Sequence, residues 1–214
     1  MNLREASARV CADDSDTIAT ITTMSRALAH KLAGENAPFE DIELLTLAVS
    51  RECDRRVLEA ELQAIERTFG DAVAVNGATY VRHEAGRIGY HSLCGTLHVE
   101  RATYRQTGVR NGSTVVPLDL AAGMIERGTP AMAKAAALGY AKHDMRDVSE
   151  DLEAAHRLPP SRATMERMAR QIAADAHAQA PVIERAVRLQ ERLPEGAHAI
   201  VIGLDRGSVP MAEE

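Results

Sequence analysis

The sequence predicts an α+β fold that is mainly helical. Hydrophobic residues make up 45% of the 214 residues, but aromatic residues make up only 3% and there is no Trp. The core must therefore be built mostly from aliphatic residues and methionine, which favours helices. Residues 78–106 differ, because β-branched and aromatic residues are concentrated there. We expect four segments: N-terminal helices over 1–70, a small antiparallel β segment over 71–112, a helical, helix-turn-helix-like region over 113–196, and a final strand within 197–214.

Residues 1–70 predict a helical hairpin. From Thr17 onward the apolar positions recur at helical spacing, at Ile18, Ile21, Met24, Leu28 and Leu32. Gly34 is placed to end this first helix, and a second helix is expected from Asp41 to Phe69. The segment has 13 acidic and 8 basic residues, which is typical of a hairpin with solvated acidic faces. Dimerisation through the hairpin is the alternative.

Two or three antiparallel strands are expected within 78–106. Gly-bearing breaks at Ala85-Gly86 and Cys94-Gly95 divide this stretch. The side chains alternate, with one face formed by Leu97, Val99 and Arg101 and the other by His98, Glu100, Ala102 and Tyr104. Between residues 80 and 112 five Arg stand against two Glu. This pattern predicts a local basic patch, with Arg101 and Arg105 as candidate DNA contacts.

Local signals predict three helices after residue 129. Pro130 suits the first turn of a helix that runs to Tyr140. Asp144 can cap a second helix that ends near Arg157, and Ser161 can cap a third after a Leu-Pro-Pro turn. The residues expected on the buried sides of the last two helices are Val148, Leu152, Ala155, Met165, Met168 and Ile172.

The clearest functional candidate is a helix-turn-helix unit over 144–174. In such a unit the second helix enters the major groove N-terminus first, where short polar and arginine side chains reach the bases. Residues 157–170 carry four Arg and one Glu, and a serine at a helix start can bind a phosphate. The candidate DNA contacts are Ser161, Arg162, Thr164, Arg167 and Arg170. An ordinary helical hairpin with a solvated arginine face is the alternative.

Two further candidates concern metal ions. His83, His91, Cys94 and His98 have spacings that can fit zinc, although strand histidines are more often merely half-buried and no Cys-x-x-Cys pair is present. Asp205 ends an apolar strand expected over 198–205, where a carboxylate is suited to Mg²⁺. A turn residue at the strand end is the alternative. The three cysteines have no short paired spacing, which argues against a disulfide framework.

Composition and charge exclude several classes of protein. The net charge is -6, so any binding of nucleic acid must come from local patches. No run approaches the roughly 18 apolar residues that span a bilayer, and the first residues lack the apolar core of a signal peptide. We therefore expect a cytoplasmic protein with no membrane partner. No Gly-rich phosphate loop, Ser/His/Asp signature or nucleophilic cysteine motif is present in the sequence.

Three stretches of the chain carry a family resemblance. The first, residues 95–104, has the form G-x-(V/L)-x-V-x-R-x-x-Y, and the second is Val-Pro-Leu-Asp at 116–119 followed by the helical stretch 129–170. The third, residues 203–214, contains the pattern D-R-x-x-V-P-M-x-E. In this order the three stretches resemble bacterial insertion-sequence transposases of the Kra group. The resemblance covers roughly residues 70–214.

The resemblance implies the N-terminal part of a DDE-type transposase that acts in DNA transposition. Residues 197–214 would then be the first strand of an RNase H-like catalytic domain, with Asp205 as its first carboxylate and as a ligand of Mg²⁺ in the complete enzyme. Because the other carboxylates are absent from this chain, we expect it to need no cofactor and to cut no DNA alone. The preceding helices would bind the transposon ends. Apart from the resemblance, a homo-oligomer formed by this chain is a further hypothesis.

The sequence departs from the family pattern over 105–108, where some relatives carry cysteines and this chain has Arg-Gln-Thr-Gly. A zinc knuckle is therefore not expected at that position. Two other functions remain open beside the DNA-binding one. The first alternative is a helical module for dimerisation or regulation. The second is an inactive remnant. In both cases the chain would modulate a full-length transposase.

Overall fold

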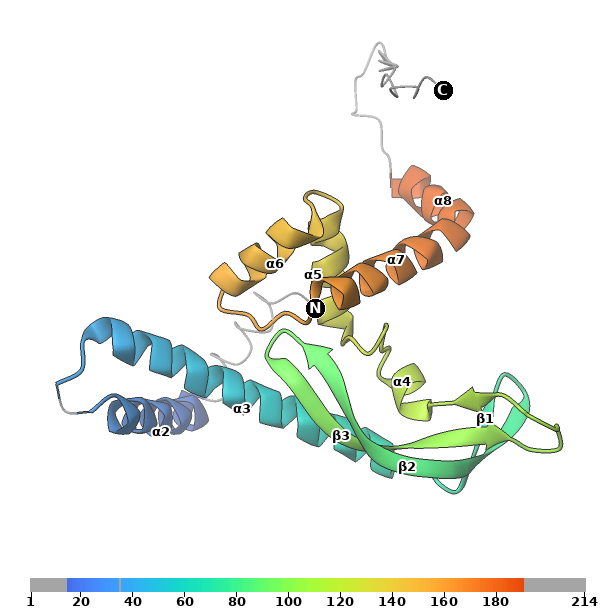
Figure 1. Ribbon diagram of the computed structural model, residues 1–214, viewed down its shortest axis with the longest axis horizontal. Helices are drawn as coiled ribbons and strands as arrows, with labels where there is room; N and C mark the ends of the chain where they lie inside the picture. Colours follow the sequence, from blue (N-terminus) through green and yellow to red (C-terminus); the bar gives the residue numbers. More distant parts are fainter. Residues whose placement is uncertain (1–14, 35, 191–214) are drawn as a thin grey trace, which may run out of the picture. The chain divides into compact units, whose positions relative to one another are not determined.

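The structure is a computed structural model that describes residues 15–34 and 36–190 (Figure 1). Within these residues it has seven helices and one four-stranded antiparallel sheet, which confirms the mainly helical α+β class. The elements are α2 (Ser15–Ala33), α3 (Phe39–Arg67), β1 (Ala72–Val75), β2 (Ala78–Ser92), β3 (Gly95–Gln106), β4 (Thr114–Val115), α4 (Pro117–Ala121), α5 (Pro130–Tyr140), α6 (Met145–Ala154), α7 (Arg162–Ala178) and α8 (Ala180–Gln190).

The chain divides into two compact units, Met1–Ala174 and Asp175–Glu214. Helix α8 belongs to the second unit, and all of the packing described below lies in the first. The predicted strand over 198–205, with Asp205, lies outside the described residues. Among the helices that the structure describes, none is both long and apolar enough to cross a membrane.

Helices α2 and α3 pack side by side near the bounds that the sequence predicts (Figure 1). Gly34 ends α2 as expected, since it adopts a left-handed φ of 91° and its N–H donates to the carbonyl oxygen of His30 at 3.0 Å. The residue of α2 that is fully buried is Ala29, which faces α3. Most of the apolar stripe of α2 is exposed, so the other described residues of the chain do not cover it.

The sheet has the order β1-β2-β3-β4. It differs from the prediction at the Ala85-Gly86 break, and it also includes β1 and β4, which lie outside the stretch 78–106 where strands were predicted; β4 falls in the segment predicted to be helical. The Cys94-Gly95 turn is present, but β2 runs without interruption through Ala85-Gly86, and Gly86 pairs with Arg101 of β3. The predicted break at Ala85-Gly86 is wrong, because a glycine in the extended conformation keeps its backbone hydrogen bonds to the neighbouring strand. The irregularity lies instead at a register shift between Arg82 and Glu84.

Side chains of α3 cover the free edge of β3. The backbone N–H groups of alternate strand residues donate to side-chain oxygens of Glu59, Gln63 and Glu66: His98 at 2.7 Å, Glu100 at 3.1 Å and Ala102 at 2.9 Å. The Gln63 amide also donates to the carbonyl oxygen of Glu100 at 3.0 Å. Positions i, i+4 and i+7 of a helix match alternate residues of a strand closely enough to make this ladder. It satisfies an edge that would otherwise invite pairing with another chain.

Helices α5, α6 and α7 share one apolar core. It contains Met132, Ala133, Ala136, Met145, Val148, Met165, Met168 and Ala169. The predicted caps are present: Asp144 accepts hydrogen bonds from the N–H groups of Arg146 at 2.7 Å and Asp147 at 3.0 Å, and these bonds lower the pKa of Asp144. Helix α6 ends earlier than Arg157, because His156 is left-handed with a φ of 54°. Ala155 is therefore exposed, and the prediction that it is buried is wrong.

Candidate nucleic-acid interface

The start of α7 exposes a row of arginines while its opposite face is buried. Ser161 caps the helix as predicted, since the Thr164 N–H reaches its Oγ at 3.4 Å and the two hydroxyl groups lie 3.0 Å apart. Thr164 is itself 8% exposed, and Met165 and Met168 are fully buried in the core shared with α5 and α6. At 100° per residue, Arg162, Arg167 and Arg170 lie within an arc of about 140°, which also contains Glu166.

The three arginines of α7 differ in what they contact. Arg162 makes no hydrogen bond or ion pair with any other residue in the described part of the chain. Arg167 lies 3.5 Å from a carboxylate oxygen of Glu126 and donates to the Thr164 hydroxyl at 3.1 Å. Arg170 pairs with Glu166, one turn earlier, at 3.2 Å. These pairs are on the surface, where an ion pair contributes roughly 0–1 kcal/mol, so both arginines can exchange partners.

The sheet arginines do not join this row. The side chain of Arg101 is only 13% exposed, and its Nη1 lies 3.9 Å from a carboxylate oxygen of Asp119. Its guanidinium also lies 5.8 Å from the centre of the Tyr90 ring. Arg105 is exposed, but it stands opposite Val81 and Thr114 near the far end of β3, about 30 Å along the strand from the Cys94-Gly95 turn.

A polar cavity of about 550 Å³ opens beside α7. It is formed by β2, α4, the loop that leads to α5, and α7, through His91, Asp119, Met124, Glu126, Arg127, Thr164 and Arg167. Sequence reasoning identified Thr164 and Arg167 as site residues but missed Glu126 and Arg127. No motif or periodicity marks those two residues, and they come together only because the loop folds back onto β2.

The loop holds Glu126 and Arg127 in an unusual backbone conformation. The N–H and carbonyl groups of Ile125 and Gly128 bond to each other at 2.9 and 2.7 Å, which closes a tight turn. The two central residues have φ values of 50° and 63°, a left-handed pair that normally requires glycine or asparagine. The turn is attached to β2, because the His91 N–H donates to the Arg127 carbonyl oxygen at 2.7 Å and the Thr129 N–H donates to that of His91 at 2.8 Å.

Burial and neighbouring charges shift the titration of two groups at the cavity. Burial, followed by the positive charges of Arg127 and Arg167, lowers the pKa of His91, so its imidazole is neutral at pH 7. Burial also raises the pKa of Tyr90, and the hydrogen bond that its hydroxyl donates to Asp119 raises it further. The lining therefore presents two guanidinium groups, two carboxylates, a neutral imidazole and the Thr164 hydroxyl group.

The candidate zinc ligands do not converge on one point. His83 and His98 are exposed on β2 and β3, whereas Cys94 is buried in the turn and its thiol is free. No group of three or more His, Cys, Asp or Glu side chains in the described part of the chain is arranged to hold a metal ion. Asp205 lies outside the described residues. Comparison of the chain with protein-family models, curated proteins and solved structures gave no match.

Proposed function

We propose that this chain binds duplex DNA through α7, as the DNA-binding N-terminal part of a DDE-type transposase. In this proposal α6 and α7 act as a helix-turn-helix, and α7 enters the major groove with Ser161 and Arg162 leading. Asp205 remains the first catalytic carboxylate of the complete enzyme, where it would bind Mg²⁺. The transposon end is the proposed DNA partner.

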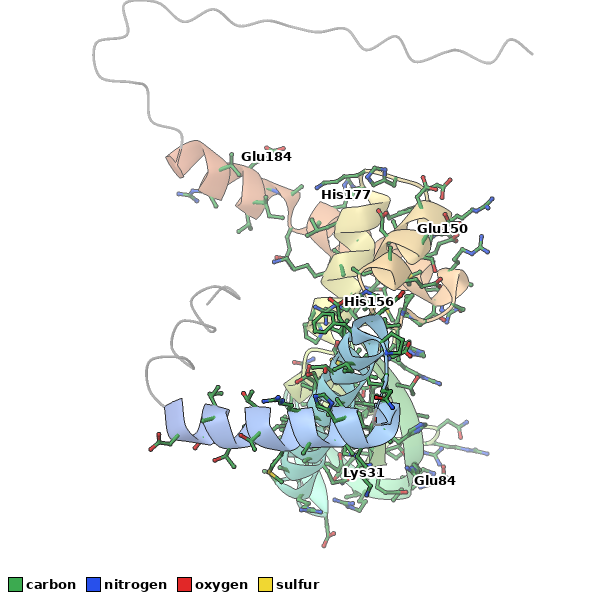
Figure 2. All side chains as sticks on the ribbon, turned by 90° about the vertical axis from the view of Figure 1, so that its left-hand side faces the viewer. Lys31, Glu84, Glu150, His156, His177 and Glu184 are labelled. Carbon is green, nitrogen blue, oxygen red and sulfur yellow. The ribbon has the colours of Figure 1, made fainter. Side chains whose placement is uncertain are left out.

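One observation carries the proposal: α7 is anchored on one side and cationic on the other. The buried residues Met165 and Met168 hold the helix against α5 and α6, which orients the exposed side without using it. Other surfaces of this helical cluster are of mixed charge, since Arg146 of α6 pairs with Glu150, which points away from the packed helices in Figure 2. Among the described residues Arg162 has no carboxylate at ion-pair distance, although its charge acts on Asp144 from farther away, so its guanidinium can contact a phosphate or a base.

Replacing Arg162 and Arg167 together with alanine is expected to weaken binding to a mixed-sequence duplex by about 10- to 100-fold. The slope of log affinity against log salt concentration should also fall by about two, because two fewer counterions are released. Fluorescence anisotropy over a range of salt concentrations measures both quantities. The matched control is Arg26→Ala with Arg67→Ala, which removes two exposed arginines of α2 and α3. Equal binding by the wild-type chain and the α7 variant would contradict the assignment of α7.

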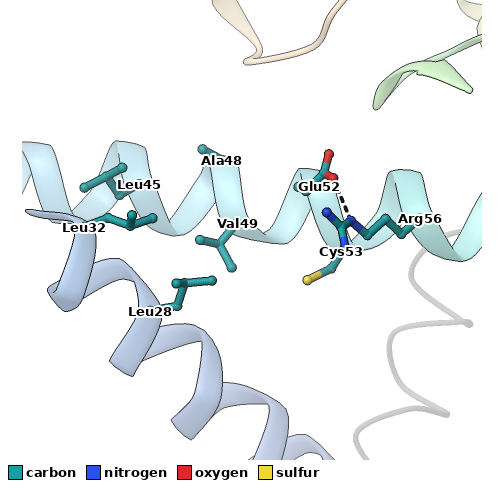
Figure 3. A pocket seen from close by; sticks show the side chains of 8 residues that line it. All are labelled: Leu28, Leu32, Leu45, Ala48, Val49, Glu52, Cys53 and Arg56. Carbon is teal, nitrogen blue, oxygen red and sulfur yellow. Dashed lines mark hydrogen bonds and ion pairs between the residues drawn. The ribbon is translucent and has the colours of Figure 1, made fainter.

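A specific observation supports a second function, self-association through α2 and α3. On α2, Ile21 is 52% exposed, Met24 68% and Leu32 58%, although amphipathic helices normally bury such residues. Beside them an apolar groove of about 400 Å³ runs between the two helices (Figure 3). Its lining residues are Leu28, Leu32, Leu45, Ala48, Val49, Glu52, Cys53 and Arg56.

A second copy of this chain is the partner that fits the surface best. Asp16 lies in the first turn of α2 and Lys31 in the last, so two α2 helices that cross antiparallel about Met24 bring opposite charges together at both ends. From helix dimensions, the apolar side of α2 and the first half of α3 presents about 600 Å². Two copies would bury about 1,200 Å², the lower limit of a stable interface.

Replacing Met24 and Leu28 with glutamate is expected to convert a dimer of the full chain into a monomer, because four buried negative charges would face each other. Light scattering after size exclusion gives the mass, and circular dichroism checks that the helices persist. The control is Leu120→Glu with Leu138→Glu, two exposed leucines of α4 and α5. A wild-type chain that is monomeric at tens of micromolar would exclude a second copy as the partner.

A further inference from the structure

Among the described residues, the charges around the polar cavity leave the Arg127 guanidinium without a partner. Glu126 is paired with Arg167 at 3.5 Å, and Asp119 faces Arg101 at 3.9 Å while it accepts the hydrogen bond of Tyr90. Arg127 lines the same cavity, but within the described residues its guanidinium has no hydrogen bond and no carboxylate at ion-pair distance. The lining itself carries two arginines and two carboxylates, and the positive charge of Arg127 is left in excess because Arg101, which lies outside the lining, faces Asp119.

The fold stabilises the unfavourable turn that holds Arg127 in this position. A left-handed conformation is unfavourable at any non-glycine residue, and here it occurs at two in succession. The conformation persists because Gly128 is buried beneath Met168, where an added Cβ would lie 2.5 Å from the Met168 Cε. Residues in strained turns of this kind cluster at ligand sites, and here the turn directs the exposed Arg127 to the mouth of the cavity.

The other groups of the cavity complement an anion with oxygen atoms. Arg167 is bound only by a surface ion pair to Glu126 and by the Thr164 hydroxyl, so it can turn to an incoming anion. His91 is neutral and keeps an N–H to donate. Guanidinium groups form paired, charge-assisted hydrogen bonds with two oxygens of a phosphate. They therefore bind phosphate better than an anion that offers one oxygen acceptor.

We propose that this cavity is a phosphate-binding site in which Arg127 is the anchoring cation and Arg167 and His91 complete the shell. The phosphate is either a backbone phosphodiester of DNA or a free phosphate group. The first source rests on the proposed function, since the cavity adjoins α7 and would hold the backbone beside the helix that reads the bases. The second source does not depend on it.

Titration of the full chain with inorganic phosphate, at an ionic strength held constant with chloride, tests the site. Bound phosphate should raise the pKa of His91, because its negative charge stabilises the imidazolium and offsets the effect of Arg127 and Arg167. Glu126 and Asp119 are the other charged groups of the cavity. Nuclear magnetic resonance of the His91 ring follows this shift, and His91→Gln identifies its signal. We expect half-saturation at about 1–10 mM phosphate.

Arg127→Gln should weaken phosphate binding by about tenfold or more, because two charge-assisted hydrogen bonds are lost. The matched control, Arg110→Gln, removes an exposed arginine outside the cavity and should leave binding unchanged. The proposal is overturned if phosphate produces no saturable shift at His91 up to about 100 mM. Equal phosphate binding by Arg127→Gln and the wild-type chain would overturn it as well.

A mixed-sequence duplex then separates the two sources of phosphate. A duplex that shifts the His91 signal and is displaced by inorganic phosphate assigns the site to the DNA backbone. A duplex that binds the chain without moving His91 assigns the site to a free phosphate group. A chain that binds phosphate but no duplex retains the phosphate site, whereas the proposed DNA-binding function fails.

Discussion

Replacing Asp119 with alanine is expected to lower the free energy of unfolding by about 2–4 kcal/mol. Asp119 joins three elements, because it lies on α4, accepts a hydrogen bond from Tyr90 of β2 and faces Arg101 of β3. Tyr90 is fully buried. Without the carboxylate, the buried Tyr90 hydroxyl would lose its acceptor, and the Arg101 guanidinium would lose the negative charge that faces it.

Urea unfolding followed by circular dichroism measures this loss. Asp119→Asn is the informative control, since the amide oxygen can still accept from Tyr90 while the charge that faces Arg101 is removed. Asp119→Asn should lower the free energy of unfolding by about half as much as Asp119→Ala. The difference between the two variants then separates the contribution of the hydrogen bond from that of the ion pair. A change below about 0.5 kcal/mol for Asp119→Ala would show that the network does not stabilise the fold.

Replacing Met168 with alanine is expected to destabilise the fold by about 2–5 kcal/mol. Met168 is fully buried, packs among the core residues of α5 and α6, and covers Gly128. Its removal leaves a cavity between α7 and the left-handed turn, which rigid neighbours can fill only in part. The exposed side of α7 and the polar cavity should both become less rigid in this variant, so the affinity for DNA should also fall.

The control for this prediction is Met168→Leu, which conserves the volume and should cost less than about 1.5 kcal/mol. Thermal and urea unfolding of the two variants give the difference directly. Equal stability of Met168→Ala and Met168→Leu would mean that the core closes around the missing atoms. The packing of α7 against the turn would then not be what orients its arginines.

The helices and their caps followed from signals that lie within a few residues of one another. Gly34, Asp144 and Ser161 act on backbone groups of their own turns, and the apolar spacing of Met165 and Met168 marks the buried face of α7. The missed hairpin of β1 and β2 also had such a signal, since Asn76-Gly77 has the left-handed pair of φ values, 49° and 78°, that a tight hairpin requires. Local steric and hydrogen-bonding rules are sufficient for features of this kind.

The site could be predicted only in part. Thr164 and Arg167 were identified because they lie on one short helix with a recognisable charge pattern. Alternation along β3 correctly grouped Arg101 with Leu97 and Val99, but it could not show that Asp119 would cover this arginine. Glu126 and Arg127 carried no signal, because their role depends on a turn that is stable only once it pairs with β2.

By itself, the sequence determined the class of the fold, the places where most helices begin and end, and the cationic side of α7. These properties depend on contacts between residues less than about two helical turns apart. Tertiary structure alone decided that Glu59, Gln63 and Glu66 cover the edge of β3 and that the stripe of α2 stays exposed. It also brought Arg127 beside His91 and Arg167. Such contacts join distant parts of the chain. They form because the free energy gained on burial exceeds the entropic cost of closing the loops between them. A local sequence pattern gives no information on this balance.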